Sequence, residues 1–209
     1  MTRTETVAQL RAERTEIAEL LASLSDQDWQ EPSLCDGWSV LDVAAHLASV
    51  VGLSRRGLMM RTVRHGAGSD RANARSAAAF AALGPDALVE AIADPDLLGL
   101  GFFQPRWAVC EAVVHHQDIR RALGRARSIP PERLQIAIDV LLAMPFLTGR
   151  ARSQRRISIV APDIDLERGN GPGLQGPGEA IAMVLAGRLD ALPELSGDAV
   201  ALFEPVAPN

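Results

Sequence analysis

The 209-residue sequence contains no lysine and no tyrosine, and only 4% of its residues are aromatic. Every basic residue is therefore arginine, and 26 acidic side chains against 21 basic ones give a net charge of -5. A protein that binds nucleic acid through its phosphates needs a broad positive surface, which this composition does not supply. The sequence therefore predicts no nucleic-acid partner.

Cysteine is also scarce, with Cys35 and Cys110 alone in the chain. Two cysteines cannot form a disulfide framework or a four-cysteine zinc site, and a pair of thiols is typical of a reducing compartment. The sequence has no run of about 18 uninterrupted apolar residues, and it starts MTRTETVAQLRAERTE, which is charged from the first residues. We therefore expect a cytoplasmic protein with no membrane partner.

Apolar residues, in contrast, make up 47% of the chain, which is enough for a large core. From Thr4 to about Leu24 they recur at spacings of three, four and seven, the pattern of an amphipathic helix. Comparable patterns predict further helices over residues 40–63, 72–83, 105–123 and from 131 onward, with a short helical turn in PDALVEAIA. Because the connections are short, these helices are expected to form an antiparallel bundle over residues 1–150.

Two of these helices carry recognisable end signals. Ser39 is followed three residues later by Asp42, which is the spacing of a capping box at a helix start. Pro105 suits the first turn of the later helix, and Gly124 suits its end.

The pattern of apolar and polar residues changes after about Arg150. RRISIVAPDIDLERG alternates apolar and polar residues and predicts a strand, GEAIAMVLAGRLDAL predicts a helix, and DAVALF predicts a second strand that pairs with the first. The predicted fold class is therefore mainly α: a helical bundle over residues 1–150 and a small α/β domain over residues 151–209.

Potential metal ligands lie on two of the predicted helices. Glu111 and His115 are four residues apart and so share one helical face, where one metal ion can join them. His46 lies among apolar residues of another helix, so its face is expected to point into the bundle. By spacing alone, the same residues also suit an ordinary surface pair and a hydrogen-bonded core histidine, and both interpretations stay open.

The other two histidines do not fit this constellation. His116 is rotated by about 100° from His115 around the helix and cannot easily replace it. His65 lies in a stretch rich in glycine and serine, where we expect it to be solvated.

Two more side chains have alternative roles. Asp118 follows His115 by three residues and suits either an acceptor that orients its imidazole or an ion-pair partner of Arg121. Cys35 precedes a predicted helix, whose dipole would favour its thiolate as a nucleophile, although a small packed cysteine is the commoner case.

Three segments carry a family resemblance: LCDGWSVLDVAAHL, EAVVHHQDIRRALG and GPGEAIAMVLAGR. In order and spacing they resemble the mycothiol-dependent maleylpyruvate isomerase family, whose helical bundle is of the DinB type, over about residues 4–204. The resemblance implies a divalent metal ion, usually zinc, bound by His46, Glu111 and His115. It also implies mycothiol as the thiol cosubstrate, with its sulfur approaching an open position on the metal. His116 stands where such sequences commonly have a small residue, and we expect it to narrow the mouth of the site.

The function implied is that of a mycothiol-dependent isomerase or S-transferase that acts on a cis-enoyl acid or another electrophile. An acid substrate needs a cationic partner, for which Arg120, Arg121 and Arg188 are candidates. The resemblance favours Arg188 as the catalytic arginine. Two alternatives remain: a metal-dependent hydrolase that uses activated water, and a non-catalytic metal-binding bundle. A monomer or a homodimer is expected.

Overall fold

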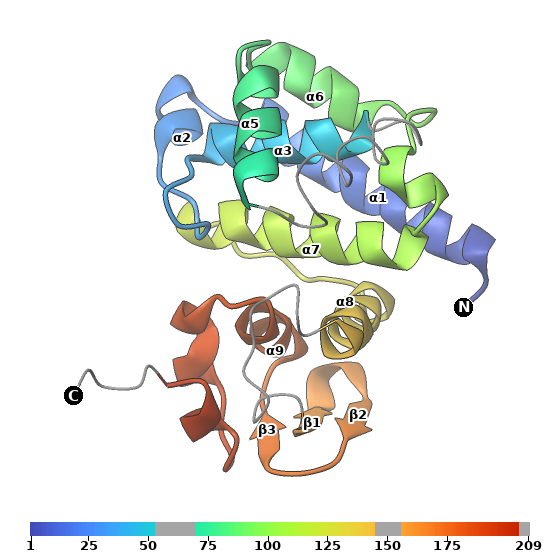
Figure 1. Ribbon diagram of the computed structural model, residues 1–209, viewed down its shortest axis with the longest axis vertical. Helices are drawn as coiled ribbons and strands as arrows, with labels where there is room; N and C mark the ends of the chain where they lie inside the picture. The colour runs from blue at the N-terminus through green and yellow to red at the C-terminus, as the bar shows by residue number, and fades with distance from the viewer. Residues whose placement is uncertain (53–69, 145–155, 205–209) are drawn as a thin grey trace. The chain divides into compact units, whose positions relative to one another are not determined.

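The computed structural model describes residues 1–52, 70–144 and 156–204 (Figure 1). Contacts between Cα atoms group the chain into two units, residues 1–127 and 128–209. The boundary predicted near residue 150 falls outside the described residues. Helix α8 (Pro131–Ala143), which the sequence analysis grouped with the bundle, belongs to the second of these units.

The first unit is helical throughout its described regular structure. Its elements are α1 (Arg3–Ala22), α2 (Asp26–Gln30), α3 (Val40–Val51), α5 (Asp70–Ala81), α6 (Pro85–Ala93), the 3-10 helix η1 (Gly99–Phe102) and α7 (Pro105–Ala122). They confirm the helices predicted in this part of the chain. The predicted continuation of the second helix beyond residue 52 lies outside the described residues, as does His65.

Helix α1 packs against α6 and α7, and α3 packs against α5, α6 and α7 (Figure 1). Apolar side chains from each of these helices are removed from water between them, and this burial is the main force that holds the unit together. Fully or almost fully buried examples are Ile17, Leu21, Val43, Ala77, Leu88, Ile92, Val113 and Ile119. The core therefore fixes the positions of α3 and α7 relative to each other.

The structure confirms the predicted residues at the ends of α3 and α7. The Ser39 hydroxyl accepts a hydrogen bond from the Asp42 backbone N–H, and the Asp42 carboxylate accepts one from the Ser39 backbone N–H at 2.9 Å. This reciprocal capping box starts α3. Helix α7 has Pro105 in its first turn and ends before Gly124, whose φ of 64° is a conformation that glycine adopts without strain.

The second unit contains a three-stranded sheet in the order β2-β1-β3. Strand β1 (Ser158–Ala161) pairs antiparallel with β2 (Leu166–Gly169) and parallel with β3 (Gly173–Gln175). Helices α8 and α9 (Gly178–Leu185) lie side by side on one side of the sheet (Figure 1). The predicted fold class, mainly α with a small C-terminal α/β segment, is confirmed.

Two strand predictions in this unit need correction. RRISIVAPDIDLERG does not form one strand, because β1 ends at a short 3-10 helix, η3 (Pro162–Ile164), before β2 begins. DAVALF forms the 3-10 helix η5 (Val200–Leu202) and no strand, following η4 (Leu189–Glu194). Ala199 and Phe203 are buried whereas Ala201 between them is exposed, and in a strand all three would face the same side.

No single described helix is both long and apolar enough to cross a bilayer. One pair, Asn73–Ala81 with Pro85–Ala93, meets the length and composition together but is bent by 114° at its break.

Candidate metal centre

The structure brings the three predicted ligands together. His46 comes from α3, whereas Glu111 and His115 are one turn apart on α7. Glu111 Oε2 lies 3.4 Å from His46 Nε2 and 3.6 Å from His115 Nε2. The centroids of the two imidazole rings are 4.9 Å apart. One carboxylate and two imidazoles, from two packed helices, therefore converge on one point.

These separations are longer than good hydrogen bonds between nitrogen and oxygen, which measure about 2.7–3.2 Å. Two ligands at about 2.0–2.2 Å from a tetrahedral zinc ion are about 3.4 Å from each other. The distances from Glu111 to the two histidines match that spacing. The side chain of Glu111 is 25% exposed, so a small molecule can approach the point where the three meet.

The pKa values of Glu111 and His115 depend on each other. Burial alone raises the pKa of Glu111, but the nearby His115 and His46 imidazoles interact with its carboxylate and hold the pKa well below its usual value. Burial alone lowers the pKa of His115, but hydrogen bonds with Asp118, Cys35 and Glu111 raise it well above its usual value. In the metal-free protein Glu111 is therefore ionised, and His115 holds a proton that a metal ion must displace.

The carboxylate of Asp118 contacts the Nδ1 side of the His115 imidazole. Its carboxylate is fully buried, and Oδ2 lies 2.9 Å from His115 Nδ1 and 3.0 Å from Cys35 Sγ. Because Asp118 keeps a proton on Nδ1, the proton that a metal ion displaces is the one on Nε2, and Nε2 is then the nitrogen available for coordination. This geometry suits the orienting role that the sequence predicts as one of two alternatives for Asp118.

The prediction that His116 narrows the mouth of the site is wrong. His116 is fully buried, and its Nδ1 lies 2.8 Å from Glu13 Oε1 of α1. Arg120 Nε donates to His116 Nε2, so that nitrogen is an acceptor and Nδ1 donates to Glu13. The rotation of about 100° from His115 places this imidazole on the face of α7 that packs against α1.

Glu13 and His116 belong to a buried ion-pair network with Arg127. Arg127 Nη2 lies 2.6 Å from Glu13 Oε1, and Nη1 lies 2.9 Å from Glu16 Oε2. Burial alone raises the pKa of Glu13, but hydrogen bonds from His116 and Arg127 lower it to about 2. These contacts have hydrogen-bond lengths and a guanidinium already balances the carboxylates, so the cluster links α1 to α7 and is not a second metal site.

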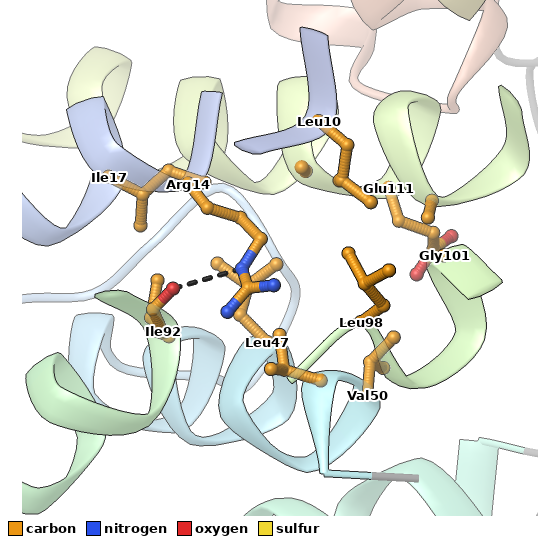
Figure 2. Close-up of a pocket in the computed structure, with 12 residues that line it drawn as sticks. Leu10, Arg14, Ile17, Leu47, Val50, Ile92, Leu98, Gly101 and Glu111 are labelled. Atoms are coloured by element: carbon orange, nitrogen blue, oxygen red, sulfur yellow. Dashed lines mark hydrogen bonds between the residues drawn. The ribbon is translucent and has the colours of Figure 1, made fainter. Parts of the chain in front are cut away.

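A small cavity has Glu111 in its lining (Figure 2). Its volume is about 30 Å³, and apart from Arg14 and Glu111 only apolar residues and a glycine line it. The Arg14 guanidinium donates to four backbone carbonyls, those of Ile92, Ala91, Asp94 and Leu97. Those carbonyls hold the guanidinium, and the apolar residues of the lining give Glu111 an apolar flank.

Arg188, the predicted catalytic arginine, lies in the second unit immediately before η4. Its side chain is half-buried, and Nη1 donates to the backbone carbonyl of Ala186 at 2.7 Å. Cys110, on α7, is buried, as expected for a packed cysteine.

Comparison with known proteins adds a family signature. Residues 10–58 match the model of the mycothiol maleylpyruvate isomerase N-terminal domain. The resemblance predicted from the sequence is confirmed. Among solved structures, the mycothiol-dependent maleylpyruvate isomerase and its histidine-to-alanine mutant each superpose with a TM-score of 0.66 at 14% identity. Each comparison covers 100% of this chain and 97% of the other, so the maleylpyruvate isomerase fold extends over the whole protein. Curated protein sequences yield no match.

The contacts of Cys35 and Trp38 with the histidines were not predicted from the sequence. Cys35 Sγ lies 3.7 Å from His115 Nδ1, and the Trp38 ring lies edge-on to His46 at 5.4 Å between centroids. Cys35 and His115 are 80 residues apart in the chain, so no local pattern connects them. The available signal was the segment LCDGWS immediately before the helix that carries His46.

Proposed function

We propose that this protein is a mycothiol-dependent enzyme with one divalent metal ion, zinc, bound by His46, Glu111 and His115. The convergence of the three side chains at ligand spacing carries the proposal. The shared fold and the family match over residues 10–58 support the choice of mycothiol as the thiol.

The donor set suits a zinc ion. Two neutral imidazoles and one carboxylate leave a net charge of about +1 with a divalent ion, which is easier to bury than an isolated carboxylate. Three protein ligands also leave one tetrahedral position open, as in catalytic sites. A zinc ion bound here supplies Lewis acidity that lowers the pKa of a thiol, which would otherwise be mostly protonated at neutral pH.

The residues around the ligands have supporting roles in this proposal. Asp118 holds the Nδ1 proton of His115 and so fixes the ring for coordination through Nε2. The apolar flank beside Glu111 lowers the local dielectric and strengthens the attraction between its carboxylate and a cation.

The thiolate permits two reactions. In the isomerase reaction, sulfur adds to the cis double bond of an enoyl acid, rotation occurs about the resulting single bond, and sulfur leaves as the trans double bond forms. In the transferase reaction, sulfur bonds to an electrophilic carbon and the leaving group departs with its electron pair. We assign substrate carboxylate binding to Arg188, on the strength of the family resemblance.

The test compares turnover with mycothiol, with glutathione and with no thiol, using zinc-loaded protein. Maleylpyruvate and a generic alkylating agent serve as substrates in parallel. We expect turnover with mycothiol and little with glutathione. A metal ion accepts almost any thiolate, so selectivity between the two thiols must come from protein groups that contact the sugar portion of mycothiol. Equal rates in all three conditions would contradict the proposal and favour the hydrolase alternative.

A further inference from the structure

The segment Leu34–Trp38, which we call the CDGW loop, is a closed turn in front of α3. The Ser33 hydroxyl donates to the Trp38 carbonyl at 2.8 Å, and the Trp38 backbone N–H donates to the Cys35 carbonyl at 3.0 Å. Gly37 has a φ of 73°, which a glycine adopts without strain. The loop therefore has one defined conformation, and its side chains are held in fixed directions.

One side of the CDGW loop is attached to α7 at Asp118. The Leu34 backbone N–H donates to the Asp118 carbonyl at 3.2 Å, and Cys35 Sγ donates to the Asp118 carboxylate at 3.0 Å. The same carboxylate oxygen binds His115 Nδ1. The thiol thus fixes the carboxylate that in turn fixes the imidazole.

The other side of the loop contacts the histidine of α3. The rings of Trp38 and His46 meet at an interplanar angle of 61°, which is an edge-to-face arrangement. His46 is 3% exposed, and the indole restricts rotation of its ring about the Cβ–Cγ bond. A single short loop therefore contacts both helices that carry the candidate metal ligands.

We propose that Cys35 and Trp38 are positioning residues that hold the two histidine rings at metal-ligand spacing before a metal ion arrives. Cys35 acts on His115 through Asp118, and Trp38 acts on His46 directly. This inference rests on the proposed metal function. Preorganised ligands lose less conformational entropy on coordination, so loosening either ring weakens metal affinity without removing a ligand.

The experiment measures zinc affinity by competition with a chromophoric chelator, for the full-length protein and four variants. Cys35→Ala removes the donor to Asp118, and Trp38→Leu keeps apolar volume but removes the aromatic edge. Each is expected to weaken zinc binding about tenfold, at the lower end of the range for groups that orient metal ligands. Cys35→Ser, which retains a donor, and Trp38→Phe, which retains an edge, are expected to stay within about threefold of the wild type.

Two further readouts separate positioning from general destabilisation. Cobalt substituted for zinc reports coordination geometry through its visible spectrum, which is expected to change in Cys35→Ala and Trp38→Leu. Trp29→Leu is the matched control, because Trp29 is buried and lies on α2, which carries none of the candidate ligands. This control is expected to lower the Tm of the metal-free protein while zinc affinity stays within about twofold of the wild type.

Three results would overturn the inference. Zinc affinity within about twofold of the wild type in Cys35→Ala and Trp38→Leu, with an unchanged cobalt spectrum, would show that the loop does not position the ligands. An equal loss of affinity in the matched control would show that the effect is general destabilisation. Absence of zinc binding by the wild type would refute the proposed metal function itself, and the inference with it.

Discussion

His115 is a candidate ligand whose surroundings favour its protonated form. Its hydrogen bonds with Asp118, Cys35 and Glu111 raise its pKa well above the usual value, whereas the pKa of Glu111 is held low. At pH 7 the metal-free protein therefore has a proton on both nitrogens of His115 and none on Glu111. Coordination through Nε2 must displace one proton.

We therefore expect about one proton to be released per zinc ion bound at pH 7, and zinc affinity to rise with pH across the neutral range. Calorimetry in two buffers with different ionisation enthalpies measures the release. Asp118→Asn removes the charge that favours the imidazolium, so this variant should release fewer protons. Equal heats of binding in the two buffers would contradict the expected protonation of His115.

The three ligands are also tested by removing them. His46→Ala, Glu111→Ala and His115→Ala are each expected to abolish the uptake of about one metal ion per chain, whereas His65→Ala retains it. Metal analysis of the purified proteins is the measurement. Full occupancy in His115→Ala would exclude this residue as a ligand, and the buried position of His116 offers no substitute.

At the scale of secondary-structure elements, the Glu13 network joins α1 to α7. Because the pKa of Glu13 is lowered from 4.5 to about 2, its contribution is fully present above about pH 5 and is lost as the pH falls through 2. A shift of this size corresponds to about 3 kcal/mol. Glu13→Gln should therefore lose about 3 kcal/mol at pH 7 and almost nothing at pH 2.

Urea denaturation between pH 2 and pH 7 checks this expectation. Glu19→Gln is the matched control on the same helix, because Glu19 is exposed and its substitution should change the free energy of unfolding by less than about 0.5 kcal/mol. Parallel pH profiles for Glu13→Gln and the wild type would show that the network does not contribute to stability.

The start of α3 is the second element-scale test. Ser39→Ala removes the hydroxyl that accepts the Asp42 N–H, and it is expected to destabilise the protein by about 1 kcal/mol. Chemical denaturation measures the loss. Ser39→Thr, which keeps a hydroxyl, should recover most of it, and a failure to recover would assign the effect to something other than the cap.

The elements that could be predicted from the sequence are those formed by interactions between residues close together in the chain. Helices α1, α3 and α7 have local signals, namely apolar periodicity, a capping box, Pro105 and Gly124, and their predictions are confirmed. The small sheet depends on pairing between distant segments, so no local pattern favours Gly173–Gln175 over DAVALF as a strand. Short apolar runs are equally compatible with a helical turn and a strand.

In the candidate site too, local relations could be predicted from the sequence and tertiary contacts could not. Glu111 and His115 were predicted to share a face because the i, i+4 relation is local. The wrong expectation for His116 arose because its partner, Glu13, is 103 residues away and the angle around the helix does not reveal what packs there. The contacts of Cys35 and Trp38 depend equally on tertiary packing.

At the scale of the whole molecule, the large apolar core predicts that the fold does not depend on the metal ion. Removal of metal by a chelator should leave the helical content unchanged, because a catalytic-type site contributes less to folding than a structural one. Zinc at a hundredfold excess over its Kd should add about 3 kcal/mol and raise Tm by about 5–10 °C. Circular dichroism and thermal denaturation with and without zinc test both statements, and unfolding on chelation would contradict the first.

The ion pair between Glu13 and Arg127 also has a consequence for biosynthesis. The two residues are 114 positions apart, and Arg127 is the last residue of the first unit. At about 5–20 residues per second, the ribosome adds Arg127 about 6–23 s after Glu13. During that interval the Glu13 carboxylate lacks its Arg127 partner, so burying this side of α1 in the nascent bundle is unfavourable. The amino-terminal unit is therefore expected to stay accessible to chaperones until its final residue has been synthesised, and to fold late despite its early start.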